Sequence, residues 1–405
     1  MLPGPRPQPL GALPWPAGML LLPEGSDDLA ADLVAGREPQ SWPEGTEFMR
    51  RALAEDVEQA AANLTGHDLV SQYNRAVLVG GEGVWEDLAA RTTGELRALV
   101  DTARFSVGEI DEAPSADEST GEIAAVVRSA RASAAIEVGD IPSAVAELAT
   151  AAAEAEEAGS PLLAASLHLT RAELMRERLD DPAAAARESD LAIQRLPLTA
   201  PSELRAELQV SRALARQQLA GTERGALLAV VADLTEASKV FREDTYPEMF
   251  ATINQHLALA YLVMPMSSEG DRIRVGVAVN SLRGALRVFT PETHPVAWAS
   301  TQLNLANALQ YLPSVHQESN LDEAVQLYEE LLQYRDPLRD PIGYARILAN
   351  QGNALGHLGV FADARERLDQ ARSLFDEAGD VESVIGVDEV LASLESAQVA
   401  AQGGS

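Results

Sequence analysis

The sequence predicts an all-α fold, organised as a right-handed α-solenoid of tandem helix-turn-helix repeats. The composition favours helix over strand, because Ala and Leu dominate while aromatic residues make up 4% of the chain. The 405 residues exceed what one compact core usually accommodates, and an open stack of repeats avoids that limit. A pattern of small and large residues recurs across residues 122–396, and such recurrence is the sequence signature of a repeat array.

The region before the repeats divides into an arm, a helical segment and a linker. Residues 1–45 are rich in Pro and Gly and predict an extended arm. The arm carries apolar residues that are costly to leave in water, which favours packing along the helices behind it: Trp15, Met19, Leu20, Leu21, Leu22 and Trp42. Residues 46–106 follow a helical period. Residues 107–121 are acidic and predict a linker, and residues 397–405 predict a flexible tail.

The last repeat shows the recurring pattern best. Its landmarks are Gly352, Leu355, Gly359, Phe361, Ala364, Leu368 and Ala371. We expect Gly352 and Ala364 where the two helices cross, because a larger side chain would force the helices apart. Gly359 is expected to end the first helix, and Phe361 and Leu368 to fill the gap between the pair.

Five earlier units carry a small residue at the same crossing position. These residues are Ala306, Ala258, Ala213, Ala172 and Ala132, at spacings of 40 to 48 residues. The unit at Ala213 matches the pattern least well, because only the segment LLAVVADLTEA is available as its second helix. We therefore expect about six helix pairs.

The segment HPVAWASTQLNLANALQYL, followed by NLDEAVQLYEELL, resembles tetratricopeptide arrays that accompany the caspase-like CHAT domain in bacteria. The matching residues are Trp298, Thr301, Gln302, Asn304, Leu305, Asn307, Ala308 and Leu309, while Ala306 replaces the usual Gly. Phe250 and Tyr344 stand in the place of Trp298 in neighbouring units. The resemblance covers residues 246–380 most closely and implies a protein-binding solenoid. Because repeats and an arm fill the length, any effector served by this array is expected to be another chain.

The charge of the chain argues against two classes of partner. The formal net charge is −31, from 62 acidic and 31 basic residues. Such a surface repels a phosphate backbone and an anionic membrane, so we expect no nucleic-acid binding and no membrane insertion. The acidity is compatible with a basic partner, but it equally serves solubility. The apolar run from Gly18 to Leu22 is too short for a signal peptide, and we expect a cytoplasmic protein.

Motifs that carry catalysis are absent from the sequence. There is no Cys, and Lys239, the only lysine, does not follow a glycine, so thiolate metal sites and a phosphate-binding P-loop are excluded. None of the six histidines belongs to a Glu-x-x-His or H-E-x-x-H motif, and no Gly-x-Ser-x-Gly elbow occurs. We therefore expect no catalytic residue, no cofactor and no metal. The sequence indicates a non-catalytic scaffold or adaptor that binds a peptide or helix of a protein partner.

Two alternatives to a scaffold remain at this point. The first keeps the fold and makes the chain a regulatory subunit or assembly chaperone of a specific bacterial enzyme or effector complex. The second and less favoured one is an enzyme whose site matches no recognised motif.

A stripe of polar residues on the first helices is the candidate binding site. Positions two and six before the small residue, and one after it, share one helical face and are expected to line the concave groove. The candidate partner-binding residues are Glu173, Glu207, Thr252, His256, Asn304, Asn307, Arg346, Asn350 and Asn353. The resemblance implies that such asparagines clamp a bound peptide. They could equally form a ladder that joins neighbouring repeats, and both interpretations stay open. We expect Trp298, Phe250 and Tyr344 to be core residues.

Overall fold

The computed structural model describes residues 7–265, 271–312 and 316–403. Within these ranges every regular element is a helix, which confirms the all-α prediction. The chain forms two compact units, residues 1–219 and 220–405.

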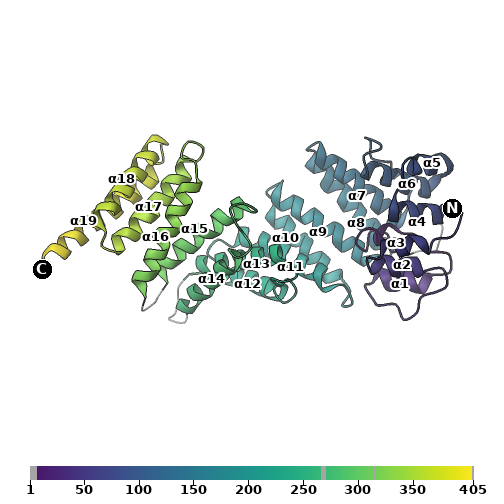
Figure 1. The fold of residues 1–405 in the computed structure, drawn as a ribbon, viewed down its shortest axis with the longest axis horizontal. Helices are drawn as coiled ribbons and strands as arrows, with labels where there is room; N and C mark the ends of the chain where they lie inside the picture. Colours follow the sequence, from purple (N-terminus) through teal and green to yellow (C-terminus); the bar gives the residue numbers. More distant parts are fainter. Residues whose placement is uncertain (1–6, 266–270, 313–315, 404–405) are drawn as a thin grey trace. The chain divides into compact units, whose positions relative to one another are not determined.

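The first unit contains a short 3-10 helix and then α1 to α11 (Figure 1). Their bounds are η1 Ala17–Met19, α1 Asp27–Val34, α2 Glu47–Leu53, α3 Val57–Ala62, α4 Leu69–Val79, α5 Val84–Arg91, α6 Gly94–Ser106, α7 Gly121–Glu137, α8 Ile141–Glu157, α9 Pro161–Glu177, α10 Pro182–Arg195 and α11 Ser202–Ala220, which reaches the unit boundary. The boundary falls inside the predicted repeat region, at the unit that matches the pattern least well.

The second unit contains α12 to α19. Their bounds are α12 Arg224–Ala237, α13 Pro247–Val263, α14 Asp271–Ala285, α15 Pro295–Tyr311, α16 Gln317–Tyr334, α17 Pro341–His357, α18 Phe361–Glu377 and α19 Val381–Gly403. Each helix contacts the next along the chain, and each first helix also contacts the next first helix, α13 with α15, α15 with α17, and α17 with α19. Figure 1 shows α15 to α18 side by side, as tandem helix pairs require.

The predicted crossing residues lie where the pattern placed them. Five of them are at most 1% exposed, each in the first helix of a pair or in α11: Ala132, Ala172, Ala213, Ala258 and Ala306. At Gly352 an added Cβ would lie 2.8 Å from Cγ of Leu368 and 3.0 Å from the carbonyl oxygen of Ala364. Because α17 and α18 meet this closely at Gly352, the helix pair needs a residue without a side chain there.

Local sequence signals define the ends of the first helices. Four of these helices begin with a proline, whose fixed φ suits the first helical position and whose missing N–H is not needed there: Pro161, Pro247, Pro295 and Pro341. The side chain of Asp340 accepts a hydrogen bond from the N–H of Gly343 and caps α17. Gly359, with φ +78°, follows the end of α17 and allows the chain to turn into α18.

The N-terminal segment is part of the core of the first unit. Leu20, Leu21 and Leu22 are completely buried, and the Asn74 side chain bonds both the N–H and the carbonyl of Leu21, each at 2.8 Å. Met19 and Trp42 are partly buried against the same core. Trp15 differs from the expectation, because it lies in the turn formed by residues 10–16 and is 64% exposed.

Candidate functional site

A hydrogen-bonded network joins consecutive repeats of the second unit. Nδ2 of Asn350 on α17 donates to Oδ1 of Asn307 on α15 at 2.9 Å, and the Tyr328 hydroxyl of α16 donates to the same oxygen at 2.6 Å. Nδ2 of Asn353 donates to Oε1 of Gln310 at 3.0 Å, and Nε2 of Gln310 donates to the Tyr328 hydroxyl at 2.6 Å. These five residues, Asn307, Gln310, Tyr328, Asn350 and Asn353, are called the amide ladder below.

The buried phenol lies at the centre of the ladder. Tyr328 is 0% exposed, and burial raises the pKa of its hydroxyl well above the usual range. The neutral hydroxyl can therefore donate to Asn307 while it accepts from Gln310. Buried hydroxyls of this kind are costly to leave unpaired, so the ladder fixes the positions of the amides around it.

A residue in one first helix bonds to a residue of the next first helix that stands three positions earlier, counted from the crossing residue of each helix. Asn307 follows Ala306 by one residue, but its partner Asn350 precedes Gly352 by two. The same offset relates Gln255 of α13 to Ser300 of α15, whose side chains are 3.4 Å apart. Because of this offset, residues at equivalent repeat positions do not bond to each other.

In each asparagine of the ladder, one of the two polar side-chain atoms forms a hydrogen bond within the ladder. The other polar atom has no partner among the described residues. Asn307 uses Oδ1 and keeps its Nδ2 donors, whereas Asn350 and Asn353 use Nδ2 and keep their Oδ1 acceptors. The three side chains are half-buried, and the remaining amide atoms are not among the fully buried unsatisfied ones. The asparagines therefore hold the repeats together and still present donors and acceptors.

The other predicted residues of the second unit lie on the first helices α13, α15 and α17. Asn304 and Thr252 are half-buried, Arg346 is exposed, and none of them makes a hydrogen bond or ion pair with a described residue, although the charge of Arg346 helps to lower the pKa of Asp380. His256 is half-buried on α13 and interacts with a neighbour. The polar stripe of α13, α15 and α17 thus contains side chains that interact with a neighbour as well as side chains without a hydrogen bond or ion pair to a described residue.

Glu173 and Glu207, the predicted site residues of the first unit, both have a raised pKa. Desolvation raises the pKa of both carboxyls, and repulsion adds to it: Glu177 and Glu207 act on Glu173, and Glu203 acts on Glu207. The charge of Arg176 opposes this shift at Glu173 without reversing it. Neither carboxylate forms an ion pair with an Arg or Lys within the described residues. The first helices α9 and α11 thus carry two carboxylates that form no ion pair within the described residues, although the charge of Arg176 acts on Glu173.

The expected core aromatics are half-buried. Trp298 packs edge-on against Tyr334 with ring centroids 5.0 Å apart, and Tyr344 contacts the same hydrophobic core. The guanidinium carbon of Arg287 lies 5.9 Å from the ring centroid of Phe250. These rings cover the ends of their helix pairs instead of lying in the centre of the core.

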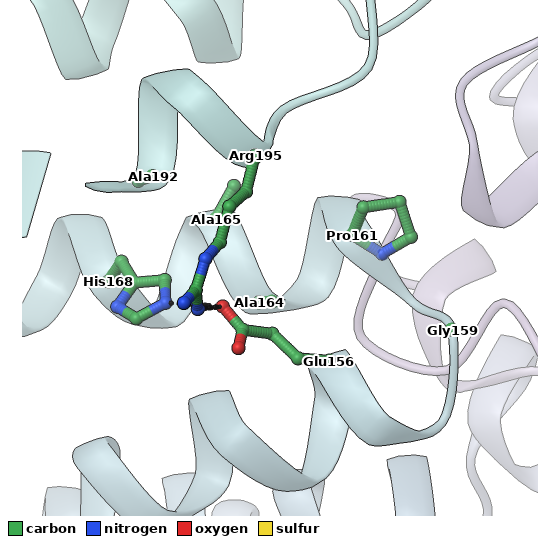
Figure 2. A pocket seen from close by; sticks show the side chains of 8 residues that line it. All are labelled: Glu156, Gly159, Pro161, Ala164, Ala165, His168, Ala192 and Arg195. Atoms are coloured by element: carbon green, nitrogen blue, oxygen red, sulfur yellow. Dashed lines mark hydrogen bonds and ion pairs between the residues drawn. The ribbon is translucent and has the colours of Figure 1, made fainter. Parts of the chain in front are cut away.

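A cavity of about 450 Å³ in the first unit was not predicted from the sequence. It lies among α8, α9 and α10, and Figure 2 shows its lining residues, Glu156, Gly159, Pro161, Ala164, Ala165, His168, Ala192 and Arg195. Most of the lining is apolar and ends at Cβ. Its polar side consists of Glu156, His168 and Arg195, in which the Glu156 carboxylate forms an ion pair with Arg195 and lies 3.1 Å from Nε2 of His168.

His168 is held between two carboxylates. Its Nδ1 lies 2.7 Å from Oε1 of Glu188, which also pairs with Arg171. Burial opposes the charged imidazole, but the hydrogen bonds and attraction of Glu188 and Glu156 outweigh burial, so the pKa of His168 is raised. Burial opposes the charged form of Glu156 and Glu188, but hydrogen bonds and attraction from His168 and the arginines outweigh burial and lower the pKa of both carboxyls. No local motif marks this cluster, because the partners of His168 are 12 and 20 residues away.

Two other kinds of site can be assessed over the described residues. In the three described ranges, no group of three or more His, Asp or Glu side chains could hold a metal ion. None of the helices described above is long and apolar enough to cross a membrane.

No protein-family model matches the chain, and no curated protein matches it. Among solved structures, the TPR2AB-domain:pHSP90 complex of yeast Sti1 is 15% identical, covers 67% of this chain and 98% of that chain, and has a TM-score of 0.25. The APC/C hetero-tetramer Cut9–Hcn1 is 12% identical, covers 91% and 95%, and has a TM-score of 0.21. Because these TM-scores are low, the description of the second unit as tandem helix pairs rests on its own helices and their contacts.

Proposed function

We propose that this chain is a non-catalytic protein–protein interaction scaffold. The face formed by α13, α15 and α17 would bind a peptide or helix of a partner. The observation that carries this proposal is the half-used amide ladder, in which the Nδ2 donors of Asn307 and the Oδ1 acceptors of Asn350 and Asn353 have no partner among the described residues.

The available amide atoms match the groups of a polypeptide main chain. A bound segment presents carbonyl acceptors and N–H donors, which the Asn307 donors and the two acceptor oxygens can pair. The ladder fixes the three side chains before binding, so less conformational entropy is lost when a partner binds. Asn304, Thr252 and Arg346 extend the same stripe with further hydrogen-bonding groups.

The charge of the chain supports a basic partner. Glu173 and Glu207 are acidic groups with raised pKa that form no ion pair with a described Arg or Lys, and the chain as a whole carries a net charge of −31. A lysine or arginine of the partner would remove the repulsion that acts on these carboxylates. The sequence resemblance to arrays that accompany CHAT domains favours a separate bacterial enzyme or effector chain as the source of that segment.

The test is a binding isotherm with a partner captured on the full chain and identified by mass spectrometry. The double variant Asn304→Ala/Arg346→Gln should weaken binding about tenfold or more, because each lost hydrogen bond contributes roughly 0.5–1.5 kcal/mol. The matched control Gln326→Ala/Arg339→Gln removes the same groups outside this stripe and should bind as the wild type does. Equal affinity for the two double variants would contradict the proposed binding face.

A further inference from the structure

The first helices of three repeats place an aromatic residue at the same position. In α13, α15 and α17 the first residue is proline and the fourth is Phe250, Trp298 and Tyr344, respectively. Each of these residues also stands eight positions before the small crossing residue of its helix. Two independent landmarks therefore define one register, and this register carries a large ring in the second unit.

The rings at this register contact the end of the second helix of the same pair. Trp298 packs edge-on against Tyr334, the last residue of α16, at 5.0 Å. Phe250 lies under the guanidinium group of Arg287, which follows the end of α14. At this register, the ring of the first helix therefore contacts either an aromatic ring or a guanidinium group.

Helix α9 has the same register but carries no ring. It also begins with a proline, Pro161, and its fourth residue is Ala164, eight positions before the crossing residue Ala172. In α10, Arg195 stands ten residues after the buried Ala185, as Tyr334 stands ten after the buried Ala324 in α16. The pair Trp298–Tyr334 therefore corresponds to Ala164–Arg195, with the ring absent.

The missing ring coincides with the cavity of about 450 Å³. Ala164, Arg195 and Pro161 all line it (Figure 2). The Arg195 side chain is 51% exposed. In α11 the same register carries Arg205, whose Nη2 donates to the carbonyl of Pro197 in the loop after α10 at 2.8 Å, and in α7 it carries Ala124, which is completely buried. In α9, by contrast, the side chain at this register ends at Cβ, and space remains.

We propose that this cavity binds an aromatic side chain of a protein partner, with its ring against the Arg195 guanidinium group. The inference deepens the proposed scaffold function and rests on it for the identity of the occupant as a protein. The floor formed by Pro161, Ala164, Ala165 and Ala192 would contact the ring edge. The ring would restore the contact that Trp298 makes with Tyr334 and that Phe250 makes with Arg287.

The polar side of the cavity is organised before a ring enters. Glu156 pairs with Arg195 and with His168, and His168 is fixed in turn by Glu188. Arg195 is thereby held at the cavity while its remaining donors and its planar face stay available. A guanidinium group attracts an aromatic face but not an aliphatic side chain, so the site should distinguish the two.

The experiment uses the full chain and two small probes, N-acetyltryptophanamide and N-acetylleucinamide, in ligand-observed NMR titrations. The tryptophan probe should bind more tightly than the leucine probe. Ala164→Phe should abolish its binding, because the new ring fills the cavity. Arg195→Gln, a change at a half-exposed position that leaves the core intact, should weaken binding about two- to fivefold. The matched controls Ala146→Phe and Arg187→Gln, at exposed positions of α8 and α10, should bind as the wild type does.

Three outcomes would overturn the inference. Unchanged binding to Ala164→Phe would place the probe elsewhere, and equal affinity for the two probes would remove the aromatic preference. Tighter probe binding after Trp15→Ser would assign the cavity to the exposed Trp15 of the chain itself. The probes replace the partner, so a failure of the probes to bind the cavity does not bear on whether the face of α13, α15 and α17 binds a partner. Equally, a failure of the partner-binding test does not bear on the probe titrations.

Discussion

Asn350 donates a hydrogen bond to Asn307 across 2.9 Å and thereby joins the first helices of two consecutive repeats. The same oxygen of Asn307 accepts from Tyr328 on the helix between them. One amide thus connects three helices of the second unit. Nearest-neighbour interfaces of this kind determine the stability of repeat arrays, so the amide ladder has consequences for unfolding as well as for binding.

Replacing Asn307 with Ala should destabilise the second unit by about 1–3 kcal/mol. The change leaves the Tyr328 hydroxyl and the Asn350 amide without their acceptor, and an unpaired buried donor costs about this much. Asn304→Ala is the matched control, because Asn304 makes no hydrogen bond with a described residue and should change stability by at most about 0.5 kcal/mol. Urea denaturation measures both. Similar losses in the two variants would show that the ladder does not stabilise the fold.

Enlarging the crossing residue Gly352 should also destabilise the fold. Gly352→Leu places new atoms against Leu368 and the backbone of Ala364, so we expect a loss of roughly 1–3 kcal/mol from overpacking. Ala306→Leu, at the same register of α15, should behave alike. Gly386→Ala is the control, because its added Cβ meets nothing within 4 Å and an alanine favours the helix. Thermal melts distinguish these variants, and an unchanged midpoint for Gly352→Leu would mean that the register is misplaced.

The sequence was sufficient to find the crossing residues but not the partners of the asparagines. A tight crossing imposes a local requirement for a small residue, and this requirement is visible at Ala306 and Gly352. The three-position offset depends on how neighbouring pairs pack, which no local pattern records. For that reason Asn304/Asn350 and Asn307/Asn353 match in sequence, while the bonded pair is Asn307 and Asn350.

The sequence did not predict the cavity beside His168, because the residues that form it are also brought together by packing between helices. Its ionic partners belong to three helices, and no spacing in the sequence places Glu156, His168 and Glu188 together. The register that carries Phe250, Trp298 and Tyr344 in the second unit has no ring in the first unit, where Ala164 stands at this position of α9. The absence of an expected side chain is harder to recognise in a single sequence than the presence of a motif.

The His168 cluster should make stability depend on pH. The folded-state pKa of His168 is raised above 6.5, so its contribution is fully present below about pH 6.5 and is lost as the pH rises through the raised value. Glu156 and Glu188 have lowered pKa values, so their contribution is present above about pH 4.5 and is lost as the pH falls through those lowered values. The facing charges are Glu156 from α8, Arg171 from α9, and Glu188 and Arg195 from α10.

Denaturation of the wild type and of His168→Gln at a series of pH values measures this contribution. The stability advantage of the wild type should shrink as the pH rises above 6.5. Glu188→Gln should move the imidazole pKa, followed by NMR, towards its ordinary value, because it removes the nearest carboxylate. A constant difference between wild type and His168→Gln across this range would show that the imidazole is not charged in the cluster.

Replacing Glu173 or Glu207 with Gln should not lower the stability of the fold, but it should weaken the binding of a basic partner. Their raised pKa values mean that the folded state disfavours the two charges, so folding gains stability as the pH falls through those values. At pH 7, Glu173→Gln and Glu207→Gln should therefore leave stability unchanged or raise it slightly, on the order of 0.5 kcal/mol, since solvent screens both groups. The same variants should weaken binding of a basic partner, because they remove the charge that attracts it.

Denaturation at pH 7 and isotherms at two salt concentrations separate these effects. The affinity lost in each glutamate variant should shrink at high salt, where charge attraction is screened. Glu137→Gln removes an exposed charge from α7 and serves as the control for net charge alone. If both variants lower stability, the carboxylates have stabilising partners within the fold and do not recognise a partner. If Glu137→Gln weakens binding equally, the attraction comes from the overall charge of the chain and not from this pair.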